Sequence, residues 1–117
     1  MKVAIVVLAD TETHEDLARV VNAMTAAAEC KEAGDEVRLV FDGAGTRWPG
    51  ELEQSAHRAH SLWEKVHDVV TGACEYCAEA FQATSSVESA GVKLLDEYHR
   101  HPSFRTLLAD GYQILTF

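Results

Sequence analysis

Positive charge is scarce in this sequence. Ten Lys and Arg residues stand against 19 Asp and Glu residues, so the formal net charge is −9. Proteins that bind nucleic acid neutralise phosphates with clustered basic residues, and the sequence has no such cluster. An anionic membrane surface would repel the chain for the same reason. We therefore expect neither nucleic acid nor a membrane among its partners.

Long apolar runs and disulfide-type cysteine patterns are also missing. No stretch is long and apolar enough to cross a bilayer, and the N-terminus lacks the cationic region and cleavage site of a signal peptide. The cysteines number three, whereas a secreted disulfide framework usually has an even count. These absences predict a cytoplasmic protein with reduced thiols.

The chain is long enough for one domain with its own core. It has 117 residues, of which 47% are hydrophobic, and we expect residues 1–117 to form a single domain. The segment KVAIVVL at residues 2–8 has almost no polar alternation, which is typical of a strand buried on both faces. Further strands are predicted at residues 36–41, 69–73, 92–95 and 112–117. Helical segments separate them, so we predict a three-layer α/β/α sandwich with a five-stranded parallel sheet.

Capping residues predict where the helices begin and end. Thr13 with Asp16 matches a capping box, and so does Ser85 with Glu88. Pro49 suits the first position of a helix that continues to residue 66. The apolar stripe of that helix steps by four and three residues: Leu52, Ala56, Ala59, Trp63 and Val66. Three glycines are expected to end helices: Gly34, Gly91 and Gly111.

A Cys-x-x-Cys pair lies at the edge of the sheet where ligands are expected. Ligands of open parallel sheets bind beyond the carboxyl ends of the strands. Cys74 follows the third predicted strand and opens a helix, where free N–H groups and the helix dipole favour a thiolate. Cys77 lies one turn later on the same side. Glu75 and Glu79 oppose thiolate formation, unless their carboxylates point to solvent.

The other residues expected to line this site come from the loops that follow the strands. They are Asp10, Asp42, Gly43, Gly45, Gly72, His99 and His101. Gly72 is expected to let the backbone turn, and Gly43 with Gly45 to form a tight turn beside the cysteines or an anion cradle. A protonated His99 or His101 would offset the two glutamates, although a mobile, solvated loop is the simpler interpretation.

Four segments together resemble the DsrE/DsrF-like family of small sulfur-relay proteins. They are MKVAIVVL at the N-terminus, FDGAG after the second strand, GACEYCAEAF around the cysteines and ADGYQILTF at the C-terminus. The resemblance covers nearly the whole chain and implies a parallel α/β/α fold. It also implies a trimer or hexamer, and persulfide sulfur carried by Cys74 between a sulfur-donor and a sulfur-acceptor protein. Family members often have a glycine where this chain reads Phe81-Gln82-Ala83.

The favoured function is thus a sulfur carrier or sulfurtransferase-like protein, with Cys74 as persulfide acceptor and Cys77 as an accessory thiol. Persulfide formation is a reversible thiol modification that needs no cofactor. Two alternatives stay open: a non-catalytic oligomeric scaffold or regulatory binding module, and a Cys-x-x-Cys thiol-disulfide oxidoreductase.

A metal site is not expected. Zinc needs about four ligands, and one Cys-x-x-Cys pair supplies two. His57 and His60 are close enough on one helix to share a metal, but a solvated helix face or an interface suits them better. Cys30 is expected in a second layer or at an interface, and the large side chains expected at an oligomer interface are Trp48 and Tyr112.

Overall fold

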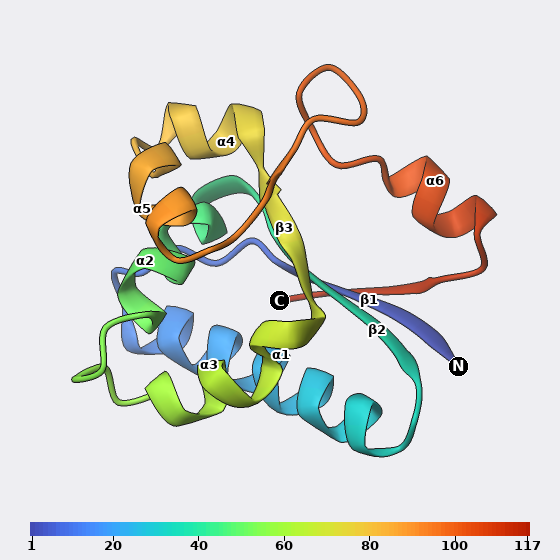
Figure 1. Ribbon diagram of the computed structural model, residues 1–117, viewed down its shortest axis with the longest axis horizontal. Coiled ribbons are helices and arrows are strands. Elements are labelled where there is room, and N and C mark those ends of the chain that lie inside the picture. Colours follow the sequence, from blue (N-terminus) through green and yellow to red (C-terminus); the bar gives the residue numbers. More distant parts are fainter.

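Five parallel strands form one sheet at the centre of the protein (Figure 1). A computed structural model describes every residue from Met1 to Phe117. In chain order the strands are β1 (Lys2–Val7), β2 (Glu36–Phe41), β3 (Val70–Cys74), β4 (Leu94–Leu95) and β5 (Gln113–Thr116). They lie in the order β4-β3-β2-β1-β5, and each neighbouring pair is parallel. The predicted α/β fold with a five-stranded parallel sheet is confirmed.

Helices cover the two faces of this sheet unequally. They are α1 (His14–Glu32), η1 (Gly43–Arg47), α2 (Trp48–Leu52), α3 (His60–Val66), η2 (His67–Val69), α4 (Glu75–Ala80), α5 (Thr84–Ser89) and α6 (Phe104–Ala109), where η marks a 3₁₀ helix. The main core joins α1 to α5 with one face of the sheet, whereas α6 packs through Leu107 on the opposite face (Figure 1). The arrangement is consistent with the predicted three layers. None of the helices has the length and apolar character needed to span a membrane.

The side chains of β1 alternate between the two faces of the sheet, so this strand packs against the helices on both sides. Val3, Ile5 and Val7 point into the main core, while Ala4 and Val6 belong to small clusters on the α6 face. Successive side chains of a strand point to opposite faces, so a strand apolar at every position is covered on both. This burial fixes the sheet and holds its carboxyl edge in place.

The first helix follows its sequence signals. Thr13 caps α1: its hydroxyl accepts the N–H of Asp16 at 3.1 Å, and the Asp16 carboxylate accepts the N–H of Thr13 at 3.1 Å. The predicted capping box is confirmed. The helix ends at Glu32, and Gly34 takes the positive φ of 83° that an ending of this kind requires.

The predicted continuous helix over residues 49–66 is wrong. The structure divides it into α2 and α3, with turns at residues 53–59. The indole Nε1 of Trp63 donates to Glu53 at 2.7 Å, and a ring nitrogen of His60 lies 2.7 Å from the carbonyl oxygen of Leu52. The first half of the apolar stripe lies in α2, which packs on α5, and the second half lies in α3, which packs on α1. The two halves therefore contact different helices.

Three smaller predictions also need correction. The N-cap position of α5 is Ala83, and no side chain caps the helix. The predicted capping box of Ser85 and Glu88 therefore does not form. The strand predicted at 92–95 is reduced to the two residues of β4. The glycine-bearing loop after β2 is the 3₁₀ helix η1, which begins where Asp42 accepts the N–H of Gly43 at 2.8 Å.

The two large side chains expected at an oligomer interface are buried instead. The indole of Trp48 packs in the main core and donates to the carbonyl oxygen of Ala9 at 2.9 Å. Tyr112 packs beside Leu107 and donates its hydroxyl to Glu36. Both residues stabilise the single chain, so the sequence-based assignment to an interface is wrong.

Candidate functional site

Cys74 ends β3 and caps the N-terminus of α4. Its Sγ accepts the N–H of Cys77 at 3.4 Å, so the helix begins one residue later than the sequence predicts. The α4 helix has only six residues, which limits the dipole that it presents to the thiol. The position at the carboxyl edge of the sheet is the one expected for a ligand site.

Gly72 has a different role from the one expected. A Cβ atom at this position would lie 2.5 Å from the carbonyl oxygen of Lys93 and 2.6 Å from Cγ of Leu95. The glycine is therefore needed for the close approach of β4 to β3, not for a turn. This tight pairing brings the segment that follows β4 close to Cys74.

Four candidate ligand atoms meet at this edge. They belong to Asp42, Cys74, Cys77 and His101, and all lie within 4.8 Å of one another. Asp42 follows β2, Cys74 ends β3, Cys77 lies on α4, and His101 comes from the segment after β4. Separate segments of the sheet edge therefore converge on one point, as the parallel topology requires.

His101 makes the shortest contact to the Cys74 sulfur. Its Nδ1 lies 3.2 Å from Sγ of Cys74, and the carbonyl oxygen of Arg100 lies 3.7 Å from the same sulfur. The ring of Tyr76 packs against the imidazole with 4.9 Å between ring centroids. The thiol thus lies among polar groups and not in a purely aliphatic pocket.

Burial overrides the expected activation of Cys74. The residue is 0% exposed, and this burial raises the pKa of its thiol to about 12, while the negative charge of Asp42 adds to the increase. The N–H of Cys77 acts in the opposite direction by favouring the thiolate, but it does not prevail. The expectation that Cys74 is a thiolate in this structure is therefore wrong. The desolvation of the buried thiol raises its pKa more than the N-terminus of the short α4 helix lowers it.

The segment after β4 folds over Cys74 and is held by Arg100. The Arg100 guanidinium bonds Glu75 at 2.9 Å and also bonds Glu79, and these contacts raise its pKa. The N–H of Tyr76 donates to the carbonyl oxygen of Arg100 at 3.0 Å. We call residues 98–101 with these contacts the cover loop. From the sequence, a protonated His99 or His101 was one candidate to offset the two glutamates and a solvated loop the simpler interpretation. Arg100, which lies between these histidines in the sequence, pairs with both glutamates instead.

A cavity opens beside the cluster. It has a volume of about 520 Å³, and two cluster members, Asp42 and His101, form part of its wall. The remaining lining residues are Tyr98, Pro102, Ser103, Phe104 and Arg105. The cavity therefore lies next to the two residues of the cluster that contact or neighbour the Cys74 sulfur, although Cys74 itself does not line it.

The other residues predicted to line the site lie outside the four-residue cluster. Asp10 is held by the N–H of Thr11 at 2.7 Å and by Arg47 at 3.0 Å, and these contacts lower its pKa.

Gly45 is required where η1 crosses β1, because a Cβ there would lie 2.2 Å from the carbonyl oxygen of Val7. Gly43 has a φ of 55° at the start of η1, and His99 is exposed with its ring against Tyr98.

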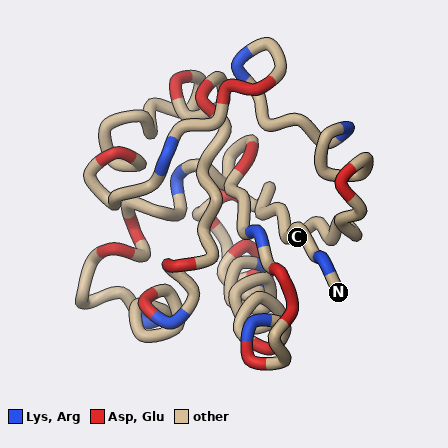
Figure 2. The backbone as a smooth tube through the Cα atoms, turned by 45° about the vertical axis from the view of Figure 1, so that its right-hand side comes forward, with Lys and Arg blue, Asp and Glu red and all other residues tan.

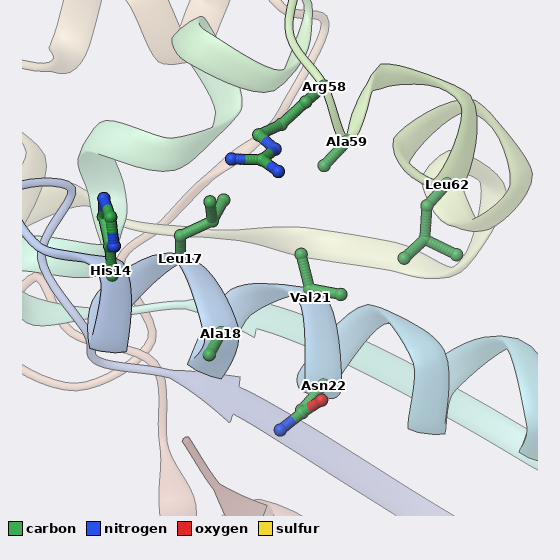
Figure 3. Close-up of a pocket in the computed structure, with 8 residues that line it drawn as sticks. All are labelled: His14, Leu17, Ala18, Val21, Asn22, Arg58, Ala59 and Leu62. Atoms are coloured by element: carbon green, nitrogen blue, oxygen red, sulfur yellow. The ribbon is translucent and has the colours of Figure 1, made fainter.

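A second cavity lies away from the cysteines. It has a volume of about 550 Å³ and lies between α1 on one side and Arg58, Ala59 and α3 on the other, where Leu17 and Val21 of α1 and Leu62 of α3 form part of its lining (Figure 3). It contains no cysteine. Nearby, His57 accepts the N–H of Ala59 at 3.1 Å, which shows a local structural role for that histidine.

Lys and Arg residues are scattered singly along the chain (Figure 2).

Comparison with known proteins gives consistent results. The DsrE/DsrF-like family matches residues 1–117. The uncharacterized protein MJ0733 of Methanocaldococcus jannaschii is 34% identical over 89 residues, which cover 76% of this chain and 72% of that protein. A solved structure, that of the conserved protein of unknown function BT1422 from Bacteroides thetaiotaomicron, superposes with a TM-score of 0.65. It is 15% identical and covers 97% of this chain and 94% of its own, which supports the fold alone.

Proposed function

The chain belongs to the DsrE/DsrF-like family, and from this premise we propose that it is a sulfur carrier that holds persulfide sulfur on Cys74. The observation that carries the proposal is the 3.2 Å contact between Sγ of Cys74 and Nδ1 of His101, with Cys77 alongside. A thiol beside an imidazole is the arrangement in which a base can take the thiol proton.

The cover loop has to open before sulfur can be loaded. Its ion pairs from Arg100 to Glu75 and Glu79 are on the surface, where such pairs contribute little. Opening would admit water to Sγ of Cys74 and relieve the desolvation that raises its pKa. His101 would then accept the thiol proton, because its Nδ1 lies 3.2 Å from Sγ of Cys74.

Loading is a redox-neutral transfer. The Cys74 thiolate attacks the terminal sulfur of a donor persulfide, a new S–S bond forms, and the donor's own S–S bond breaks. The donor leaves as a thiolate and takes up the proton held by His101. Delivery reverses the step, with an acceptor thiolate attacking the terminal sulfur on Cys74. Cys77 lies close enough to act as the accessory thiol in either direction.

Exposed aromatic side chains lie beside His101 and around the neighbouring cavity. Tyr76, Tyr98 and Phe104 are exposed, and the last two line the cavity beside His101. Exposed aromatic residues are favoured at protein interfaces. We place the sulfur-donor and sulfur-acceptor proteins here. A trimer or hexamer would use the other exposed apolar side chains, such as Leu108 and Leu115. All three cysteines are free, which suits a reducing compartment such as the cytoplasm.

The proposal is tested by intact-mass measurement after exposure to a persulfide donor. Wild-type protein is expected to gain one sulfur atom, Cys74→Ser to gain none, and Cys30→Ser to gain the same amount as wild type. A reversible Cys74–Cys77 disulfide without sulfur uptake would favour the oxidoreductase instead. Absence of any Cys74-dependent chemistry would favour the scaffold or regulatory module.

A further inference from the structure

We propose that Asp42, Cys74, Cys77 and His101 form a binding site for one zinc ion. The sequence supplies only two of these residues as a recognisable pair, and for that reason a metal was not expected. The fold adds a carboxylate and an imidazole from two other segments, which completes a set of four. The inference rests on this set and does not depend on the sulfur-carrier proposal.

The donor atoms match the preferences of zinc. Two thiolates, one imidazole nitrogen and one carboxylate oxygen are all common zinc ligands, and four of them fill a tetrahedral site. Calcium and magnesium prefer oxygen ligands, so a set with two sulfurs disfavours both. The carboxylate of Asp42 is buried and takes part in none of the protein's ion pairs, so it lacks the counter-charge that a cation would supply.

The spacing of the donor atoms is close to that of a filled site. Sulfur ligands lie about 2.3 Å from zinc, so tetrahedral neighbours are separated by roughly 3.8 Å. The four atoms here lie within 4.8 Å of one another, and the Cys74 to His101 pair is already at 3.2 Å. Small side-chain rotations are therefore sufficient, and binding releases the two thiol protons to solvent.

The surroundings already hold the ligands in place. The N–H of Cys77 donates to Sγ of Cys74, and the N–H of Gly43 donates to Oδ1 of Asp42. The ring of Tyr76 packs on the imidazole of His101. Such contacts around a metal site orient the ligands and tune affinity.

Zinc and persulfide would compete for the same sulfur. Zinc withdraws electron density from a bound Cys74 thiolate and holds it inside the ligand set, which lowers both its nucleophilicity and its access to a donor, and a persulfide on Cys74 changes the position of the ligand atom. Preloading with zinc is therefore expected to block sulfur uptake, while the metal-free protein takes up sulfur if the sulfur-carrier proposal is correct. The two proposals can thus fail separately.

Cobalt titration of the reduced, metal-free full chain tests the site, because Co²⁺ reports its ligands by absorption. We expect one Co²⁺ per chain, with thiolate-to-cobalt charge transfer in the near ultraviolet and the intense visible bands of tetrahedral geometry, all removed by added Zn²⁺. Cys77→Ser should reduce the charge-transfer band, whereas Cys30→Ser should not. Asp42→Asn should weaken zinc at least tenfold, measured by competition with a chromophoric chelator.

Asp10→Asn is the matched control, since Asp10 also lies beyond the end of a strand but outside the cluster. Equal weakening by Asp10→Asn and Asp42→Asn would overturn the assignment. So would a wild-type cobalt spectrum without sulfur ligation, or no binding at all. Sulfur uptake by the metal-free protein is measured in parallel: uptake without zinc binding removes only the zinc site, and zinc binding without uptake removes only the sulfur carrier.

Discussion

Cys30 and Cys74 are both free thiols withdrawn from water, yet they lie in very different surroundings. Cys30 is half-buried near the end of α1 against the main core, where burial raises its pKa and the charge of Asp35 adds to the increase. Cys74 is buried as well, but a carboxylate, a second thiol and an imidazole face it from neighbouring segments. Burial alone does not define a site, whereas convergence of polar groups at the sheet edge does.

The strongest test of this contrast removes the imidazole. His101→Gln is expected to slow sulfur uptake at Cys74 about a hundredfold, because it removes the group that accepts the thiol proton. Uptake rates would be followed by quenched-flow mass spectrometry. His99→Gln is the matched control, since His99 lies in the same loop but is exposed. Equal rates in the His101→Gln variant and wild type would show that the contact has no role in loading.

Glycine substitutions compare the backbone near each cysteine. Gly72→Ala should cost about 2 kcal/mol in the free energy of unfolding, because its Cβ would press against the carbonyl oxygen of Lys93. Gly34→Ala should cost about 1 kcal/mol, since space is open but φ is 83°. Urea denaturation measures both. A larger loss at Gly34 than at Gly72 would contradict the tight β3–β4 approach.

Loosening the cover loop should expose one thiol and not the other. Arg100→Gln removes both ion pairs to Glu75 and Glu79, so alkylation of Cys74 by iodoacetamide should accelerate about fivefold. Alkylation of Cys30 should keep its wild-type rate. Peptide mapping of the alkylated protein gives both rates from one sample. Equal acceleration at both cysteines would indicate general destabilisation instead of loop opening.

The smallest effect is expected at an ion pair near Cys30. A hydrogen bond from Lys31 at 2.6 Å lowers the pKa of Asp68, so the pair stabilises the protein above about pH 4 and this contribution is lost as the pH falls through the native pKa. Because the pair is exposed, Asp68→Asn should cost only a few tenths of a kcal/mol at pH 7. Thermal unfolding from pH 7 to pH 3 should show the difference from wild type shrink, and a difference that grows in acid would contradict it.

Local signals predicted the parts of the fold that depend on local chemistry. The Thr13 cap, the buried strands and their parallel pairing follow from residue types and spacing, and this topology places Cys74 at the carboxyl edge of the sheet. The break between α2 and α3 was not predictable, because both halves continue one apolar stripe. Only their packing on α5 and α1 separates them.

The site itself depends on contacts between residues far apart in the sequence. Asp42 and His101 were predicted to line the site, but no spacing rule indicates that they meet both cysteines within 4.8 Å. The ionisation of Cys74 was predicted in the wrong direction, because the sequence shows the helix start but not the loop that excludes water. Arg100 lies 26 positions from Cys74 in the sequence, yet its side chain pairs with Glu75 and Glu79 and its carbonyl oxygen lies 3.7 Å from the sulfur.

The decisive measurement for a sulfur carrier is to locate the transferred sulfur atom on one cysteine. Wild-type protein is exposed to a persulfide donor, the remaining thiols are blocked, and peptides are mapped for the extra sulfur atom. We expect the added sulfur on Cys74 and none on Cys30. Sulfur on Cys30, or no stable addition to any cysteine, would contradict it.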